Sequence, residues 1–281
     1  MPQLFAASLG EIMKVSWKIG AWGSLSIVLF ALLVVCGVWI YLSRDAGQLR
    51  TQWIVVELLF VALCIVVGIL VNGRPDGILI SDRNRISLER TQWVAWLIVL
   101  LGGYFVAAMW NVTHGTAFPT MQTDLFALLG IVSISPVISN VIVDNKKNQS
   151  PQSAPAGGPA AQPGAPAAGR AVAPPEQLTA GDDPQRVGVM DANKSPYEAS
   201  WSDLYLGEEV ANRYVVDISR LQKLIITVIL VFAYGVYLWR LFGPSAPADL
   251  NMPLAGRDFL ALLGISHGAY LASKTTTKTP A

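Results

Sequence analysis

The chain has 281 residues, of which 53% are hydrophobic and only 14% are charged, and its formal net charge is +1. Soluble domains carry about 25% charged residues, so this composition predicts an integral membrane protein whose main surrounding is the lipid bilayer. The near-neutral charge excludes a broad basic surface for nucleic acid. The two Cys and two His are too few for a zinc site at the usual ligand spacings, and no cofactor is expected.

Residues 1–18 precede the first long apolar run and are predicted to form an amphipathic segment on the membrane surface. Charged residues at positions 11, 14 and 18 recur there at helical spacing, as in interfacial helices. Residues 19–72 hold two apolar runs and predict a transmembrane hairpin. Glu57 lies inside the second run, where a carboxylate is costly unless it is paired or reaches the interface. It is therefore either an interfacial side chain or an intramembrane polar site for proton or cation coupling.

Residues 73–90 carry four Arg and are predicted to form a cytoplasmic loop, and residues 91–143 supply the third and fourth spans. Pro136 lies inside the fourth span and predicts a kink, because proline cannot donate a backbone hydrogen bond. This span is unusually polar, and its polar side chains are those of Ser133, Ser135, Ser139 and Asn140. Asn140 is a second candidate intramembrane polar site.

Residues 144–196 are rich in Pro and Ala and predict a disordered cytoplasmic linker. Residues 197–220 then interleave aromatic and acidic residues and predict a short amphipathic helix or collar before the fifth span. This segment either packs on the membrane domain and lipid headgroups or docks a protein partner. The aromatic residues that would dock a partner are Tyr197, Trp201, Tyr205 and Tyr214.

Residues 221–274 supply the fifth and sixth spans, and residues 275–281 form a tail. Gly264, Gly268 and Ala272 follow one another at four-residue spacing, a stripe of small residues that favours close helix packing. Ser135 and Ser139 form a weaker version in the fourth span. Both stripes predict helix packing within the protomer or a seam between protomers. His267 lies in the middle of the sixth span and is either a neutral imidazole bonded to a neighbouring helix or a proton or ligand site.

Two stretches of the chain echo each other in the same order. Residues 124–131 (DLFALLGI) and 258–265 (DFLALLGI) agree at six of eight positions. Upstream of each octad, residues 87–92 and 217–222 share the pattern polar, aliphatic, any, Arg, any, Gln. The sequence therefore predicts an all-α integral membrane protein with six transmembrane helices, in which spans 3–4 and 5–6 form a tandem repeat of the same orientation.

Most Lys and Arg residues fall on one side of these six spans. The positive-inside rule places that side, with both termini and the linker, in the cytoplasm. The Ala- and Pro-rich linker resembles the high-GC coding style of bacteria, so the predicted location is the plasma membrane, specifically a bacterial inner membrane.

No phosphate-binding loop, catalytic triad or metalloprotease motif occurs, so the protein is predicted not to be an enzyme. The leading hypothesis is a membrane anchor or scaffold that presents its cytoplasmic segment to a partner protein or membrane-associated complex. One alternative is a small homo-oligomeric channel, based on the small-residue stripe and the polar fourth span. Another is a parallel-repeat transporter that uses Glu57 and His267.

Overall fold

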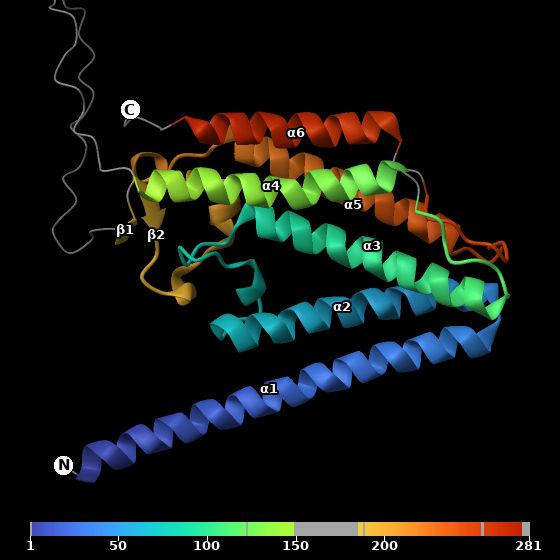
Figure 1. Cartoon of the computed structure of the whole chain (residues 1–281), viewed down its shortest axis with the longest axis horizontal. Helices are drawn as coiled ribbons and strands as arrows, with labels where there is room; N and C mark the ends of the chain where they lie inside the picture. Colours follow the sequence, from blue (N-terminus) through green and yellow to red (C-terminus); the bar gives the residue numbers. More distant parts are fainter. Residues whose placement is uncertain (1, 122, 149–184, 188, 254–255, 277–281) are drawn as a thin grey trace, which may run out of the picture.

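The computed structural model describes residues 2–121, 123–148, 185–187, 189–253 and 256–276, with backbone only for residues 2–22 and 185–187. Six α-helices dominate this part of the chain: α1 (Pro2–Ser43), α2 (Leu49–Asn72), α3 (Leu88–Thr113), α4 (Thr123–Lys147), α5 (Ile218–Leu241) and α6 (Arg257–Thr275). They run side by side and alternate in direction (Figure 1). The start of α1 and the end of α6 lie at the same end of the bundle.

The remaining elements are short. An antiparallel pair of strands joins β1 (Gln185–Val187) to β2 (Met190–Ala192). Single 3-10 turns are Ala46–Gln48, Gly77–Leu79, Pro196–Glu198, Trp201–Leu204 and Val210–Asn212. All but the first lie at the end of the bundle where α1 begins and α6 ends (Figure 1).

Five helical segments of the described chain are long and apolar enough to cross a membrane: Gly23–Ser43, Ala46–Asn72, Leu88–Thr113, Thr123–Lys147 and Ile218–Leu241. The sixth helix, α6, is not among them, because charged residues and His267 lower its hydropathy. It nevertheless runs beside α4 and α5 (Figure 1). The structure thus agrees with an all-α multi-pass membrane protein, and the crossing by α6 stays a prediction.

The first helix is longer than a bilayer requires. At about 1.5 Å per residue, the 42 residues of α1 exceed a hydrocarbon core of about 30 Å by a wide margin. The backbone stays helical across the boundary predicted between residues 18 and 19, so a surface segment and a span would belong to one continuous helix. No proline after Pro2 interrupts the helix. The predicted amphipathic character of residues 1–18 depends on side chains outside those described.

The two sequence echoes occupy matching positions in the helices. Ser87 is the N-cap of α3 and accepts a hydrogen bond from the backbone N–H of Arg90. Asp217 is the N-cap of α5 and accepts from Ser219 and Arg220. Capping residues accept bonds that would otherwise be missing at a helix start. Each octad begins at the second residue of its helix, α4 or α6.

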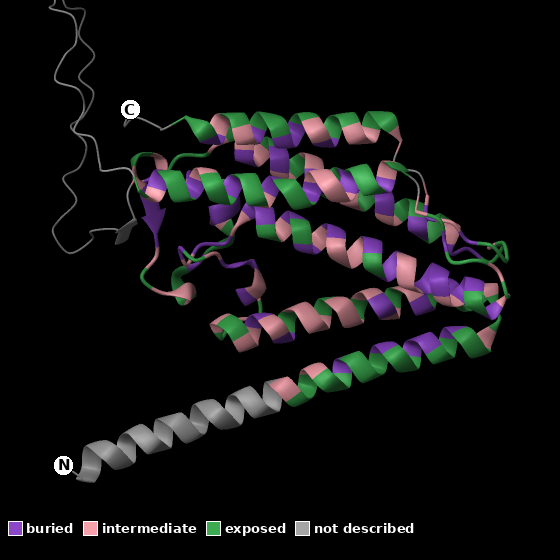
Figure 2. Cartoon of the chain, viewed as in Figure 1, coloured by how far each residue is buried: buried purple, intermediate pink, exposed green. Residues whose placement is uncertain are grey.

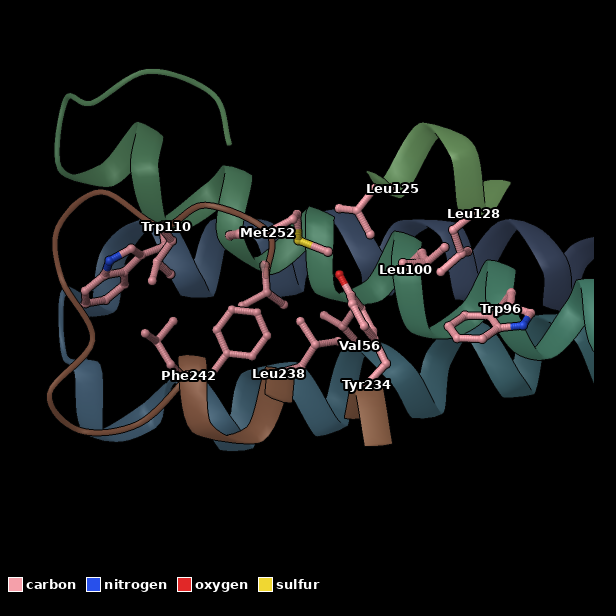
Figure 3. Close-up of a cluster of buried hydrophobic side chains, with 14 of the residues drawn as sticks. Val56, Trp96, Leu100, Trp110, Leu125, Leu128, Tyr234, Leu238, Phe242 and Met252 are labelled. Carbon is pink, nitrogen blue, oxygen red and sulfur yellow. The ribbon is translucent and has the colours of Figure 1, made fainter. Parts of the chain in front are cut away.

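The hydrophobic core lies where α2, α3, α4 and α5 meet (Figure 3). Trp96 of α3 is fully buried and contacts the rings of Tyr234 on α5 and Phe259 on α6 edge-on. Leu125 and Leu128 of α4 pack into the same cluster. Figure 2 shows that buried residues face neighbouring helices whereas exposed residues follow the outer faces. An apolar outer surface is what contact with lipid requires.

An asparagine near the end of α3 links the two loops at the opposite end of the bundle. The buried amide of Asn111 donates to the carbonyl oxygens of Ala117 and Leu250, and its oxygen accepts from the Leu250 N–H at 2.8 Å. Trp110 donates to the Pro247 carbonyl at 2.8 Å. These bonds fix the α3–α4 and α5–α6 connections to each other.

The end of α2 and the following turn approach so closely that only glycine fits. A Cβ added to Gly77 would lie 2.2 Å from the carbonyl oxygen of Gly68. We expect Gly77→Ala to lower the free energy of unfolding by about 1–3 kcal/mol, the usual cost of overpacking. Gly268→Ala is the matched control, because a Cβ there meets nothing within 4 Å. Unfolding in mixed detergent and SDS micelles measures both, and a Gly77→Ala variant as stable as wild type would contradict the packing.

Candidate functional site

Residues 189–217 form a folded cap on the bundle, which we call the collar. The sequence predicted a short amphipathic helix or a collar for residues 197–220, and no α-helix forms there before α5 begins at Ile218. Successive 3-10 turns, capped by Ser195 and Ser200, are linked instead by bridges between Leu206 and Val216 and between Met190 and Glu209. Short polar side chains that bond nearby backbone N–H groups favour turns over a continuous helix. The predicted linker also includes folded residues at both ends, in α4 and in the collar, and its positions 149–184 lie outside the described residues.

Three arginines of the loop between α2 and α3 hold the collar. Arg85 is buried and bonds the carboxylates of Asp191 and Asp203 at 3.0 and 3.1 Å, as well as the Gly207 carbonyl. Arg83 pairs with Glu208 at 3.0 Å. These contacts join segments more than 100 residues apart. A guanidinium can serve several acceptors at once, which suits it to such a junction.

The third arginine, Arg74, bonds backbone oxygens. One of its nitrogens donates to the carbonyls of Pro196, Tyr197 and Ala199 at 2.9–3.0 Å. Its other nitrogens bond the carboxylate of Asp76, which keeps the guanidinium in place. Arg74 therefore holds residues 196–199 of the collar, whereas Arg83 and Arg85 hold its acidic residues.

Under the collar lies a group of buried ionic side chains, which we call the charge cluster: Glu89, Glu208, Arg220, Lys223 and Lys274. The Lys274 ammonium lies 2.9 Å from Glu89 and 2.8 Å from Glu208. Arg220 forms an ion pair with Glu208 and donates to the Asp203 carbonyl. Each carboxylate thus has at least one cation in contact, as burial of charge requires.

Hydroxyl groups complete the coordination of Glu89. Ser139 of α4 donates to the Glu89 carboxylate at 2.6 Å and accepts from Lys274 at 2.7 Å. Tyr270 of α6 also donates to Glu89 and accepts from Lys274. Side chains from α3, α4 and α6 therefore meet in one hydrogen-bonded unit.

Lys223 of α5 is the most enclosed cation of the cluster. Its side chain is fully buried. The ammonium donates to Ser135 at 3.2 Å and lies 4.0 Å from the centroid of the Tyr270 ring. A cation over an aromatic face is stabilised by the ring quadrupole. Among the described residues no carboxylate forms an ion pair with it at contact distance.

The environment of Glu208 perturbs its titration. Burial alone would raise the pKa of this collar carboxyl, but the charges of Lys274, Arg220 and Arg83 hold the pKa well below its ordinary value of 4.5. A carboxyl with a lowered pKa in the folded state stabilises the fold above its unfolded pKa. That stabilisation is lost as the pH falls through the folded value.

The thermal stability of the protein in detergent is therefore expected to fall as the pH is lowered from 7 to 3. Glu208→Gln removes the titrating group and should flatten this dependence, while it lowers stability at pH 7. Melting curves of both proteins across the pH range measure the effect. Parallel pH profiles for wild type and Glu208→Gln would contradict the assignment.

A cavity of about 330 Å³ opens beside the charge cluster, between α3, α4 and the α2–α3 loop. Glu89, Glu208 and Lys274 form part of its wall. Ser133 and Asn140 of α4 line it and are exposed on the outside of the helix. The remaining lining residues are Ile78, Ser81, Asp82, Arg83, Ser87, Arg90, Trp93, Val94, Pro136, Ser139 and Val143.

The predicted small-residue stripe of α6 does not pack within the described chain. Gly268 and Ala272 are exposed, and a Cβ on Gly264 meets only Ile131, at 3.9 Å. The buried face of α6 instead carries larger side chains, among them those of the charge cluster. Ser135 and Ser139 differ, because both are buried and bond the cluster. α4 continues through Pro136 without a break.

The candidate intramembrane polar residues lie in separate places. Glu57 accepts from Trp53 at 2.7 Å and lies against Gly102 of α3. His267 is buried within electrostatic range of Lys223 and Glu89, and neither ring nitrogen has a hydrogen-bond partner among the described residues. Asn140 lines the cavity. No described contact joins Glu57 to His267.

The charge cluster was not predicted from the sequence. Glu89 and Lys274 lie at the edges of apolar runs and Glu208 lies in the polar segment before the fifth span, where a solvated charge is the usual expectation. One residue of the cluster did indicate a buried ionic site. Lys223 lies within the first turns of a predicted span, where a buried cation needs a nearby acceptor. The acceptors are far away in sequence, so pattern analysis cannot pair them.

The fold, with five helices long and apolar enough to span a membrane, agrees with a helical protein of the multi-pass membrane class. Among the described residues no group of three or more His, Cys, Asp or Glu side chains is arranged to hold a metal ion. Comparison with known proteins found no match: no family model, no curated protein and no solved structure matches this chain. Its function is therefore inferred from the chemistry of its own residues.

Proposed function

We propose that this protein is a non-enzymatic membrane anchor that presents its collar as a rigid docking surface to a cytoplasmic protein partner. The observation that carries this proposal is that acidic side chains of the collar face the bundle whereas aromatic side chains face outward. Three acidic residues of the collar, Asp191, Asp203 and Glu208, are turned inward and pair with arginines. Its aromatic residues Tyr197, Trp201, Tyr205 and Tyr214 remain exposed.

Exposed aromatic side chains of this kind suit recognition of a protein. Trp201 and Tyr214 keep 55% and 75% of their surface exposed, respectively. Trp and Tyr are the residue types that most often dominate binding energy at protein interfaces. Because the collar is already ordered by Arg74, Arg83 and Arg85, docking on it incurs little additional entropy loss.

The orientation proposed from the sequence places the collar in the cytoplasm of a bacterial cell. The collar end of the bundle carries most of the cations, including those of the charge cluster. The opposite end carries few, at the α1–α2 turn and the loop between α5 and α6. The positive-inside rule supports this assignment.

Substitution of exposed aromatics tests the docking proposal better than deletion of the segment, which would also remove Asp203 and Glu208. We expect Trp201→Ser/Tyr214→Ser to lose a protein that co-purifies with wild type in mild detergent, with affinity reduced by about 30-fold or more. Phe118→Ser is the control, because Phe118 is 66% exposed at the opposite end. A partner retained by the double variant, or lost equally in the control, would contradict the proposal.

The cavity beside the charge cluster supports a transporter as the second candidate. Its lining joins buried charges to exposed polar residues of α4, as expected of a substrate pathway. Saturable uptake into proteoliposomes that is lost in Asn140→Leu would favour this candidate. The homo-oligomeric channel predicts bilayer conductance instead, with Gly268 and Ala272 at the seam.

A further inference from the structure

The cavity between α3 and α4 combines a charged end with an apolar wall. Arg83, Arg90 and Ser87 line it near the collar, whereas Trp93 and Pro136 line it further along the helices, away from the collar. Its volume of about 330 Å³ is within the usual range for small-molecule sites, about 300–1,000 Å³. A ligand that fills it must therefore be polar at one end and apolar at the other.

The charge that remains to be neutralised in this cavity is positive. Its three carboxylates are each paired, Asp82 with Lys147, Glu89 with Lys274, and Glu208 with Arg83, Arg220 and Lys274. Arg90 differs, because it is exposed at the edge of the cavity, bonds the Ile80 carbonyl and has no ion pair among the described residues. An anion beside Arg90 would supply the missing partner.

A second observation comes from Arg83. Its side chain is only 7% exposed, and its Nε–H is buried without a hydrogen-bond partner among the described residues. Leaving a buried donor without an acceptor is unfavourable, so a ligand acceptor there would be favoured. The first turn of α3, capped by Ser87, also faces this region with the positive end of its helix dipole.

The cavity reaches the outside of the bundle within the apolar zone. Ser133 and Asn140 line it from the exposed side of α4, between exposed apolar residues such as Ile134 and Val137. Trp93 on α3 is also partly exposed there. An opening of this kind admits a molecule from the bilayer, and its acyl chains would lie on the apolar outer surface of α3 and α4.

We propose that this cavity binds a phosphate-bearing anion, supplied as the headgroup of an anionic phospholipid from the cytoplasmic leaflet. Arg90 and the Arg83 Nε–H would hold the phosphate, and Trp93 would contact the first part of an acyl chain. Basic pockets between transmembrane helices on the cytoplasmic side are known to favour such headgroups. The site is separate from the exposed aromatics of the collar, so its failure leaves the docking proposal intact.

The test uses the full-length protein in nanodiscs of phosphatidylcholine that contain a titrated fraction of lipid with brominated acyl chains. The quenching that is due to Trp93 is obtained by subtracting the fluorescence quenching of the Trp93→Phe variant from that of wild type. We expect brominated phosphatidylglycerol to quench Trp93 with about fivefold higher apparent affinity than brominated phosphatidylcholine, as one cation near the membrane surface contributes. Arg90→Gln should abolish this preference, whereas Arg90→Lys should keep it.

Two further variants separate a site from a general effect of charge or folding. Arg44→Gln removes a cation at the opposite end of the bundle and should leave the preference unchanged. Ser133→Phe fills the cavity from an exposed position and should abolish the preference without a change in charge. Equal quenching by both lipids in wild type, or a preference that survives both Arg90→Gln and Ser133→Phe, would overturn the proposal.

Soluble ligands distinguish the source of the phosphate. Inorganic phosphate and glycerol 3-phosphate are added at millimolar concentration to the protein in phosphatidylcholine nanodiscs. We expect neither to change Trp93 fluorescence, because neither fills the apolar part of the cavity. A saturable change with either one, without a preference for phosphatidylglycerol, would contradict a lipid ligand.

Discussion

Replacing Arg85 with Met is expected to lower the free energy of unfolding by about 3–5 kcal/mol, the cost of breaking a buried ion pair from one side. Arg85 is the common partner of Asp191 and Asp203. Its loss leaves two buried carboxylates short of their nearest cation and frees the Gly207 carbonyl. The same variant should detach the collar, since this contact joins it to the α2–α3 loop. Hydrogen exchange of collar amides, measured beside SDS-induced unfolding, would report both effects.

Arg213→Gln is the matched control for Arg85. Arg213 also approaches Asp191, but at 3.6 Å and with a more exposed side chain. The longer distance weakens this pair relative to the direct contacts of Arg85, so Arg213→Gln should cost clearly less stability than Arg85→Met. Equal losses for the two variants would show that the direct contacts of Arg85 do not set the strength of the collar attachment.

Lys274→Met is expected to lower the free energy of unfolding as much as Arg85→Met does, by about 3–5 kcal/mol. The reason is that Lys274 contacts both Glu89 and Glu208. Adding Glu89→Gln to this variant removes one of the stranded charges. The double variant should therefore be more stable than Lys274→Met alone. Thermal melting in detergent of wild type, both single variants and the double variant yields the coupling energy.

The control for Lys274 is Lys147→Met. Lys147 pairs with Asp82 and Asp144, whose side chains are largely exposed, so its loss should cost about 1 kcal/mol or less. If the double variant lost the sum of the two single effects, Glu89 and Lys274 would not act as a pair.

The long helices could be predicted from the sequence because apolar runs of spanning length have no soluble alternative. The first residues of α3 and α5 could also be predicted, since Ser87 and Asp217 are residue types that commonly cap a helix in front of such runs. The five apolar helices agree with this prediction. The tandem repeat stays a prediction.

The collar and the charge cluster could not be predicted for a physical reason. Their stability depends on pairs such as Glu89 and Lys274, which lie 185 residues apart and have no local sequence pattern. The stripe at Gly264 and Gly268 does not pack closely against the described helices, and a seam between protomers stays a prediction. Small residues at helical spacing identify a helix face, but larger polar side chains, such as Tyr270, determine which face of α6 is buried.

Site-specific photo-crosslinking in living cells tests the central claim most directly. A benzophenone side chain replaces Trp201 or Tyr214 on the collar, and Phe118 at the opposite end serves as the control position. The account predicts that both collar positions crosslink to the same cytoplasmic protein, and that position 118 does not. Crosslinks from the collar only to lipid would contradict it, because the exposed aromatics would then be membrane anchors rather than a docking surface.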